Sequence, residues 1–184
     1  MAYRNANYAA FYVDEPFSGN LGAYKARDFC YYQTLKMWKS EDASFPFIDA
    51  HAKTYNVRDS SSWESTLKPR LHERLLLSKN IVLFLSSHTR QSRALREELE
   101  YGMGDLGLPV IVVYPGFNPV NLCGNVSRTA RDLWELAPSF RSHYLEVPTL
   151  HVPMEKAALS KALSDPDFVV QSKTIPGIYR LEER

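Results

Sequence analysis

The chain alternates between short apolar runs and longer segments whose apolar residues recur every three or four positions. The runs IVLFLS (81–86) and LPVIVVYP (108–115) are continuously apolar, which is typical of strands covered by helices on both faces. Weaker runs at 8–14, 45–52 and 147–153 also have the composition of strands. The pattern therefore predicts five strands.

The segments between these runs predict helices. Ser61 with Glu64 three residues later is a capping-box signal for a helix start. Pro69 is expected to break or restart that helix, because an interior proline costs about 3 kcal/mol. The other helices are expected at 22–39, 92–106, 126–137 and 154–164.

Strands that alternate with helices argue for a parallel sheet with right-handed crossovers. We predict an α/β, flavodoxin-like three-layer domain with a central five-stranded parallel sheet. The whole chain, 1–184, is interpreted as one domain with its core at about 8–165, and no element is assigned to the tail, 166–184. Ligands of such sheets bind beyond the carboxyl ends of the strands, where Asp14, Asp49 and the segment from Ser86 fall.

The helix expected at 92–106, which begins SRALREELEYG, holds three glutamates within four residues. At about 100° per residue, one face of this helix is apolar and consists of Leu95, Leu99, Gly102, Met103 and Leu106. Glu97 points away from that face, to solvent, while Glu98 and Glu100 lie on its two shoulders. The helical-wheel angles therefore do not distinguish Glu98 from Glu100. Glu98 is nearer to the helix start, and hence to the crevice, so position favours it.

A purely structural interpretation of the same glutamates stays open. Arg93 with Glu97 and Arg96 with Glu100 are i,i+4 pairs, which stabilise an exposed helix by a few tenths of a kcal/mol. On periodicity alone, all three glutamates can be surface charges.

Charge and composition narrow the function classes. With 22 basic and 21 acidic residues the net charge is +1, and no basic run predicts nucleic-acid binding. No apolar stretch approaches about 20 residues, so we expect no membrane span. Cys30 and Cys123 fit no metal spacing and are expected to be buried, reduced thiols of a cytoplasmic protein. The five histidines show no metal spacing either, and we assign no metal.

From about Tyr8 to Pro115 the chain resembles a TIR-like domain, in particular the bacterial branch that includes the TIR subunit of the Thoeris anti-phage system. The stretches that carry the resemblance are AAFYVDE, FPFIDA, IVLFLSSHTRQS and SRALREELEYGMGDLGLPVIVVYP. TIR enzymes often have the pattern Ser, any residue, Trp, Cys, two residues and Glu. Ser92 and Glu98 match its ends, while Ala94 and Leu95 stand where Trp and Cys often are.

The resemblance implies an NAD⁺ glycohydrolase or ADP-ribosyl cyclase in which NAD⁺ is a substrate rather than a cofactor and Glu98 is catalytic. A carboxylate suits this chemistry because it stabilises the positive charge that develops on the ribose as nicotinamide leaves. The product expected is an ADP-ribose-type second messenger, in the first place a cyclic one. Self-association into a homo-oligomer and a downstream effector that senses the product are implied as well.

Six further residues are candidates for contact with the substrate: Phe11, Tyr12, Asp49, Ser86, Ser87 and Trp63. The two aromatic residues of the first strand can stack on a base, but such residues are more often core. The aspartate can bind a ribose or an amide, or close a turn. The serines stand where a phosphate meets backbone N–H groups, yet serines also cap helices. The tryptophan can wall a pocket or fix the start of its helix.

Two other functions remain as alternatives. A non-catalytic TIR-like module that signals by self-association is favoured by the absence of Trp and Cys at Ala94 and Leu95. A different nucleotide-processing enzyme on the same kind of fold, such as a nucleoside deoxyribosyltransferase, also uses a glutamate. Release of nicotinamide from NAD⁺ separates the three.

Overall fold

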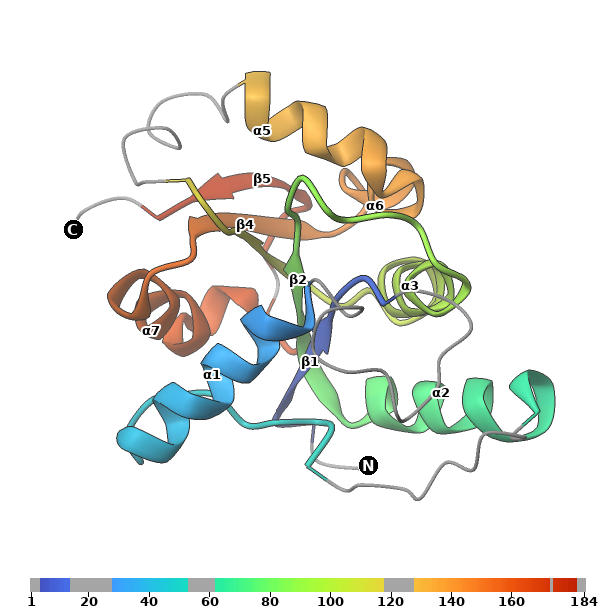
Figure 1. The fold of residues 1–184 in the computed structure, drawn as a ribbon, viewed down its shortest axis with the longest axis horizontal. Coiled ribbons are helices and arrows are strands. Elements are labelled where there is room, and N and C mark those ends of the chain that lie inside the picture. Colours follow the sequence, from blue (N-terminus) through green and yellow to red (C-terminus); the bar gives the residue numbers. More distant parts are fainter. Residues whose placement is uncertain (1–3, 14–27, 53–61, 118–127, 173, 182–184) are drawn as a thin grey trace.

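The computed structural model describes residues 4–13, 28–52, 62–117, 128–172 and 174–181. They form one all-parallel sheet with the strands β1 (Ala6–Ala10), β2 (Ser78–Phe84), β3 (Val110–Tyr114), β4 (Pro148–Pro153) and β5 (Gly177–Arg180), in that spatial order. Figure 1 shows helices on both sides of this sheet. The α/β class, the three layers and the parallel five-stranded sheet are as predicted.

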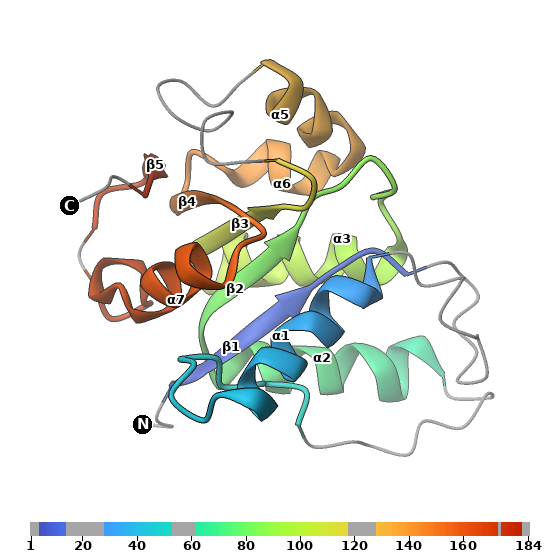
Figure 2. The ribbon, with the colours of Figure 1, turned by 60° about the vertical axis from the view of Figure 1, so that its left-hand side comes forward.

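Two helices cover one face of the sheet, namely α1 (Phe29–Glu41) and α7 (Lys156–Ser164). The other face packs against α2 (Lys68–Leu76), α3 (Arg93–Leu99) and α6 (Pro138–His143), with α5 (Arg128–Asp132) beside α6. In Figure 2, α1 and α7 lie in front of the sheet and α3 lies behind it. Alternation along β2 explains both layers, because Ile81 and Leu83 face α2 and α3 whereas Val82 and Phe84 face α1 and α7.

The strand predicted at 45–52 is wrong except for a single parallel bridge between Asn7 and Asp49. Pro46 has no N–H to give to a ladder, and an aspartate turn ends the segment, with the Asp49 carboxylate accepting from the N–H of His51 at 2.8 Å. What made the segment look like a strand is burial, since Phe45 and Phe47 fill the core under α1.

The fifth strand, β5, comes instead from the tail to which no element was assigned, and it pairs with β4. The bridged segment beside β1 keeps the flavodoxin-like placement of the second element, outside the first strand. The predicted count of five is therefore right, but the membership differs from the prediction by one strand at each edge.

The helix expected from Ser61 has its described start one residue later. The hydroxyl of Ser62 accepts from the N–H of Ser65 at 3.4 Å, while Ser61 lies outside the described residues. A π-helical turn, Trp63–Leu67, precedes α2, and Pro69 stands in the first turn of α2. The helical backbone continues through this junction, since Leu67 and Lys68 are both right-handed helical and the Lys68 N–H donates to the Trp63 carbonyl. Next to Pro69 the hydrogen-bond pattern changes from π-helical to α-helical, but the helix neither breaks nor restarts there, contrary to the prediction.

A buried chain of hydrogen bonds ties β3, β4 and β5 together. The indole N–H of Trp134 donates to the Tyr114 hydroxyl at 2.7 Å, and that hydroxyl lies 2.7 Å from Nδ1 of His151. Nε2 of His151 is 3.0 Å from the Thr149 hydroxyl, which donates to the Gly177 carbonyl. Because each hydroxyl has one proton, every bond runs in the same direction and His151 carries its proton on Nε2. Burial lowers the pKa of His151 to about 3, which keeps the ring neutral.

Two predictions made from composition can be compared with the described residues. None of the helices in the described ranges is long and apolar enough to cross a membrane. Cys30 is an exposed thiol, so the prediction that it is buried is wrong. It stands one residue into α1, where the buried positions are instead Tyr32 and Leu35. Cys123 lies outside the described residues.

Candidate active site

Glu98 is held on α3 by the way that this helix begins. The Ser92 hydroxyl accepts from the N–H of Leu95 at 3.1 Å, which caps the helix at its first turn. Leu95 and Leu99 are fully buried one turn apart. Glu98 lies between them in sequence and is turned toward β1, where the Tyr8 hydroxyl donates to Oε1 at 2.8 Å. The shoulder position predicted for Glu98 is thus an inward one.

The carboxyl of Glu98 is enclosed although its stem reaches the surface. Its second oxygen, Oε2, is buried and has no hydrogen-bond partner among the described residues. Burial raises the pKa of Glu98 to about 8, more than the Tyr8 hydrogen bond and the positive charge of Arg74 lower it. At neutral pH the group is mostly protonated in this ligand-free state. A buried polar atom without a partner costs about 1–3 kcal/mol, so Oε2 is a natural contact for a ligand.

His51 and Arg74 complete the polar cluster beside Glu98. The His51 ring lies 4.7 Å from the Tyr8 ring, between centroids. Its Nδ1 is 3.3 Å from Nη1 of Arg74, and its Nε2 is 3.0 Å from the Ala9 carbonyl. Since arginine only donates, Nδ1 accepts and Nε2 carries the proton. Burial and the Arg74 charge lower the pKa of His51 to about 4, so the ring is neutral and Arg74 is the fixed cation near the carboxyl.

Asp49 and Phe11 lie on the other side of His51. The Tyr32 hydroxyl donates to Oδ2 of Asp49 at 2.7 Å, and Oδ1 accepts from the backbone of His51. The Phe11 ring stacks on Tyr32 with 5.3 Å between centroids and lies 6.4 Å from the His51 ring. The structure therefore places Phe11 and Asp49 beside His51, and the Tyr8 side chain links His51 to Glu98.

Ser86 and the backbone of Tyr12 belong to a different cluster, around Asp28, whereas the Tyr12 ring is partly buried against the core that includes Tyr8. The Ser86 and Thr89 hydroxyls donate to the two carboxyl oxygens of Asp28 at 2.6 and 2.7 Å. The backbone N–H of Tyr12 bonds the same carboxyl, whose pKa is raised by burial. Ser86 thus fixes the loop after β2 to the start of α1, and Ser87 is exposed. A phosphate at this point would have to share the site with an acidic group.

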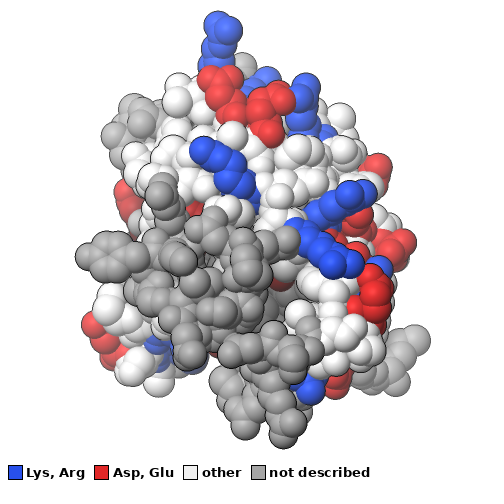
Figure 3. All heavy atoms as spheres, turned by 45° about the vertical axis from the view of Figure 1, so that its right-hand side comes forward, with Lys and Arg blue, Asp and Glu red and all other residues white. Residues whose placement is uncertain are grey.

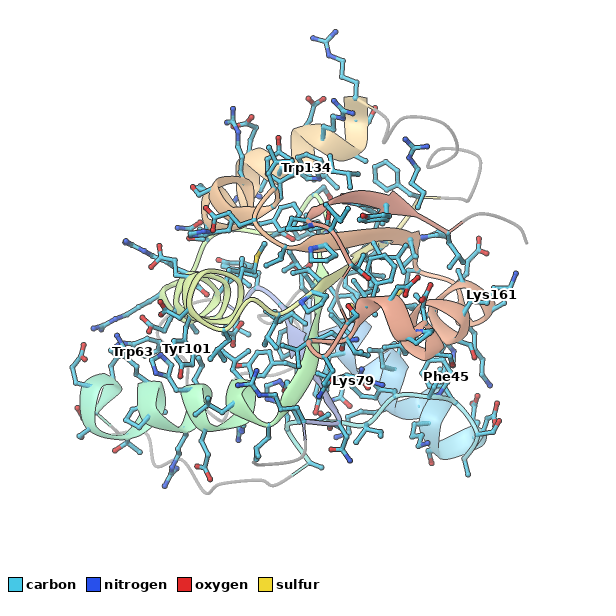
Figure 4. The ribbon with its side chains drawn as sticks, turned by 180° about the vertical axis from the view of Figure 1, so that it is seen from behind. Phe45, Trp63, Lys79, Tyr101, Trp134 and Lys161 are labelled. Carbon is cyan, nitrogen blue, oxygen red and sulfur yellow. The ribbon has the colours of Figure 1, made fainter. Side chains whose placement is uncertain are left out.

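Trp63 reaches the first turn of α3 from a remote part of the sequence. The guanidinium carbon of Arg93 lies 4.7 Å from the centre of the Trp63 ring, and Arg93 also pairs with Glu64. In Figure 4, Trp63 and Tyr101 lie in the seam between α2 and α3. Trp63 is half-buried there and packs against the core that includes Tyr8 and Leu95.

The other two glutamates of this segment, Glu97 on α3 and Glu100 in the π-helical turn that follows it, have separate roles. Glu97 was predicted to point to solvent, which is wrong, because α2 packs along that side. Its carboxylate is 2.7 Å from His72 and 3.1 Å from Lys68. The predicted pair of Glu100 with Arg96 is confirmed at 2.8 Å. On this side of the molecule basic and acidic side chains are interspersed (Figure 3), rather than gathered by sign.

A groove of about 730 Å³ between α7 and β5 lies elsewhere. Its lining includes Lys161, Phe168, Tyr179 and Arg180, and none of its lining residues belongs to the cluster around Glu98. The groove is thus separate from the Glu98 cluster. That cluster is the one built from β1, α2, α3 and the turn at Asp49.

A parallel five-stranded α/β sheet, with a glutamate on the helix after β2 facing β1, is the arrangement expected of a TIR-like domain. The family model of the Thoeris protein ThsB, TIR-like domain, matches residues 8–119. The chain belongs to this family, and membership implies a role in Thoeris anti-phage defence. The match spans β1, β2, α3 and β3, and thus the whole cluster around Glu98.

Proposed function

We propose that the protein cleaves the bond between nicotinamide and ribose in NAD⁺ and makes a cyclic ADP-ribose-type messenger, with Glu98 as the catalytic carboxylate. The observation that supports this most is the enclosed Glu98 carboxyl, whose Oε2 has no partner in the described part of the chain. A structural glutamate would be expected to use both oxygens, as Asp28 and Asp49 do.

The chemistry needs one carboxylate and little else. The ribose–nitrogen bond breaks, its electron pair stays on nicotinamide, and nicotinamide leaves neutral, so no acid has to protonate it. The ribose is left with the positive charge, which ionised Glu98 stabilises at close range in a medium that water does not screen. Attack by a ring nitrogen of the adenine closes the cycle without a further reagent. Attack by water instead gives linear ADP-ribose and a proton.

The raised pKa of Glu98 is compatible with this role. NAD⁺ brings its own cation, the nicotinamide ring, which favours the ionised form of a neighbouring carboxyl. Arg74 acts in the same direction from the other side. Once the bond has broken, nicotinamide is neutral and no longer attracts the carboxylate. The negative charge of Glu98 then stabilises the positive charge on the ribose.

Cells that contain this protein are expected to accumulate nicotinamide when phage infection triggers its activity. Nicotinamide and ADP-ribose products are measured by mass spectrometry in such cells with and without phage infection. We expect both to rise over uninfected cells, and purified, concentrated protein to act on NAD⁺ but not on NADH. Dihydronicotinamide would have to leave as an anion. Absence of nicotinamide release from NAD⁺ in both settings would contradict the proposal.

The second candidate is a TIR-like module that signals by self-association without catalysis. Ala94 and Leu95 favour it, because they replace the Trp and Cys of the enzymatic pattern. Leu95 is fully buried and serves packing alone. The enclosed Glu98 carboxyl, whose Oε2 has no partner in the described ranges, supports the enzyme over the module.

A further inference from the structure

Tyr8 is the one described side chain that hydrogen-bonds the Glu98 carboxyl. It stands in the middle of β1, is 1% exposed, and its ring packs in the core beneath α2 and α3. A tyrosine at such a core position is expected to find a partner for its hydroxyl. Here the partner is not a backbone carbonyl or a neighbour on the sheet but the proposed catalytic group.

We propose that Tyr8 is a positioning residue of the proposed reaction: its hydroxyl holds Oε1 of Glu98, assigns Oε2 to the substrate, and keeps this buried carboxyl able to ionise. The proposal rests on the proposed function for its consequence in catalysis. Its physical basis does not, because the 2.8 Å bond and the unpartnered Oε2 belong to the ligand-free protein.

The hydroxyl acts on the protonation of Glu98 because it donates. A donor stabilises the charged carboxylate more than the neutral acid, and hydrogen bonds to charged groups contribute about 1.5–3 kcal/mol. Burial of the ring, and after it the Glu98 carboxyl, raises the pKa of Tyr8 well above its usual range, so the phenol stays protonated and keeps donating.

The elements around Glu98 offer few other groups that could take over this role. From α2, Arg74 faces the carboxyl as a charge, while Lys68 and His72 face Glu97. The next turn after α3, together with α6, also packs on α3. Their charged groups pair at the surface: Glu100 with Arg96, Arg141 with Glu135, and His143 with Glu146. Asp105 is exposed. Tyr8 is thus the only hydroxyl donor to Glu98 in the described ranges.

The test is a carboxyl titration of Glu98 by NMR in protein labelled with ¹³C-glutamate, with the Glu98 signal assigned by its loss in Glu98→Gln. Wild type is expected to titrate with a pKa of about 8. Tyr8→Phe keeps the ring and is expected to raise the midpoint by about one pH unit, which corresponds to about 1.4 kcal/mol. Tyr101→Phe is the matched control, since Tyr101 stacks on His72 and has no contact with the carboxyl.

Nicotinamide release gives the second readout. If ionised Glu98 is required, Tyr8→Phe is expected to be about tenfold slower than wild type at pH 7 and to approach it as the pH rises above both midpoints. A merely structural loss would lower the rate at every pH alike. Should Tyr8→Phe fail to fold, difluorotyrosine placed at position 8 keeps the ring, is a stronger donor, and is expected to lower the midpoint.

The outcomes separate this inference from the proposed function. An unchanged Glu98 midpoint in Tyr8→Phe, or in the fluorinated protein, overturns the role of Tyr8 whatever the activity is. Absence of nicotinamide release by wild type defeats the proposed function but leaves the titration, and hence the assignment of Oε1 to Tyr8, fully testable.

Discussion

Glu98→Gln is expected to make the domain more stable than wild type at pH 8 while it removes NAD⁺ cleavage. Because burial raises the pKa of Glu98 to about 8, the folded state holds a proton that the unfolded chain, with a value near 4.5, releases. The contribution of Glu98 to the free energy of unfolding is therefore fully present below about pH 4.5 and is lost as the pH rises through 8. Glutamine has the same shape and no proton to lose.

The size of this effect follows from the same shift. Between pH 6.5 and pH 8, wild type is expected to lose about 2 kcal/mol through Glu98, and Glu98→Gln none of it. Urea unfolding of both proteins at the two pH values measures the difference. Glu97→Gln is the matched control, because the pKa of Glu97 is shifted in the opposite direction: its partners His72 and Lys68 lower it. Removal of that carboxylate should therefore not stabilise the domain. Equal pH dependence in wild type and Glu98→Gln would contradict the enclosed carboxyl.

Tyr114→Phe is expected to cost about 3 kcal/mol, because it removes the hydroxyl that joins Trp134 to His151 in the buried chain of hydrogen bonds. Trp134 then keeps a buried N–H without its acceptor, and Nδ1 of His151 loses its donor. Each such group costs about 1–3 kcal/mol. The loss should appear as a lower urea midpoint without a change of slope.

Tyr144→Phe provides the control for that measurement. Its ring packs on the same Trp134, at 5.0 Å between centroids, but its hydroxyl takes no part in the chain. We expect a change within about 0.5 kcal/mol. Equal losses in the two variants would show that the rings, and not the hydrogen bonds, hold β3, β4 and the Trp134 segment together.

Much of the fold could be predicted because its signals are local. The continuous apolar runs gave β2 and β3, and the alternation with helices gave the parallel sheet. The segment 45–52 misled because buried phenylalanines resemble a strand whether or not their backbone is paired, and pairing depends on a distant partner at Asn7. β5 is only four residues long and partly exposed, so it carries no such run.

The site was predictable only in part. The helical wheel placed Glu98 and Glu100 on equal shoulders, and it could not tell which shoulder faces β1. It also misplaced Glu97, because the helix that covers this side comes from elsewhere in the sequence. Tyr8 had a usable signal, since β1 alternates and Tyr8 shares a face with Ala10, under α2 and α3. His51 and Arg74 had none, because only the folded chain brings them together.

We propose Glu98, rather than the neighbouring Glu97 of α3, as the catalytic group in NAD⁺ cleavage. The most direct measurement is the rate of nicotinamide release from saturating NAD⁺ by purified wild type, Glu98→Gln and Glu97→Gln at equal high protein concentration. We expect Glu97→Gln to stay within about threefold of wild type and Glu98→Gln to fall by at least about a thousandfold, as for loss of an electrostatic stabiliser of several kcal/mol. Release by Glu98→Gln at the wild-type rate would contradict the claim.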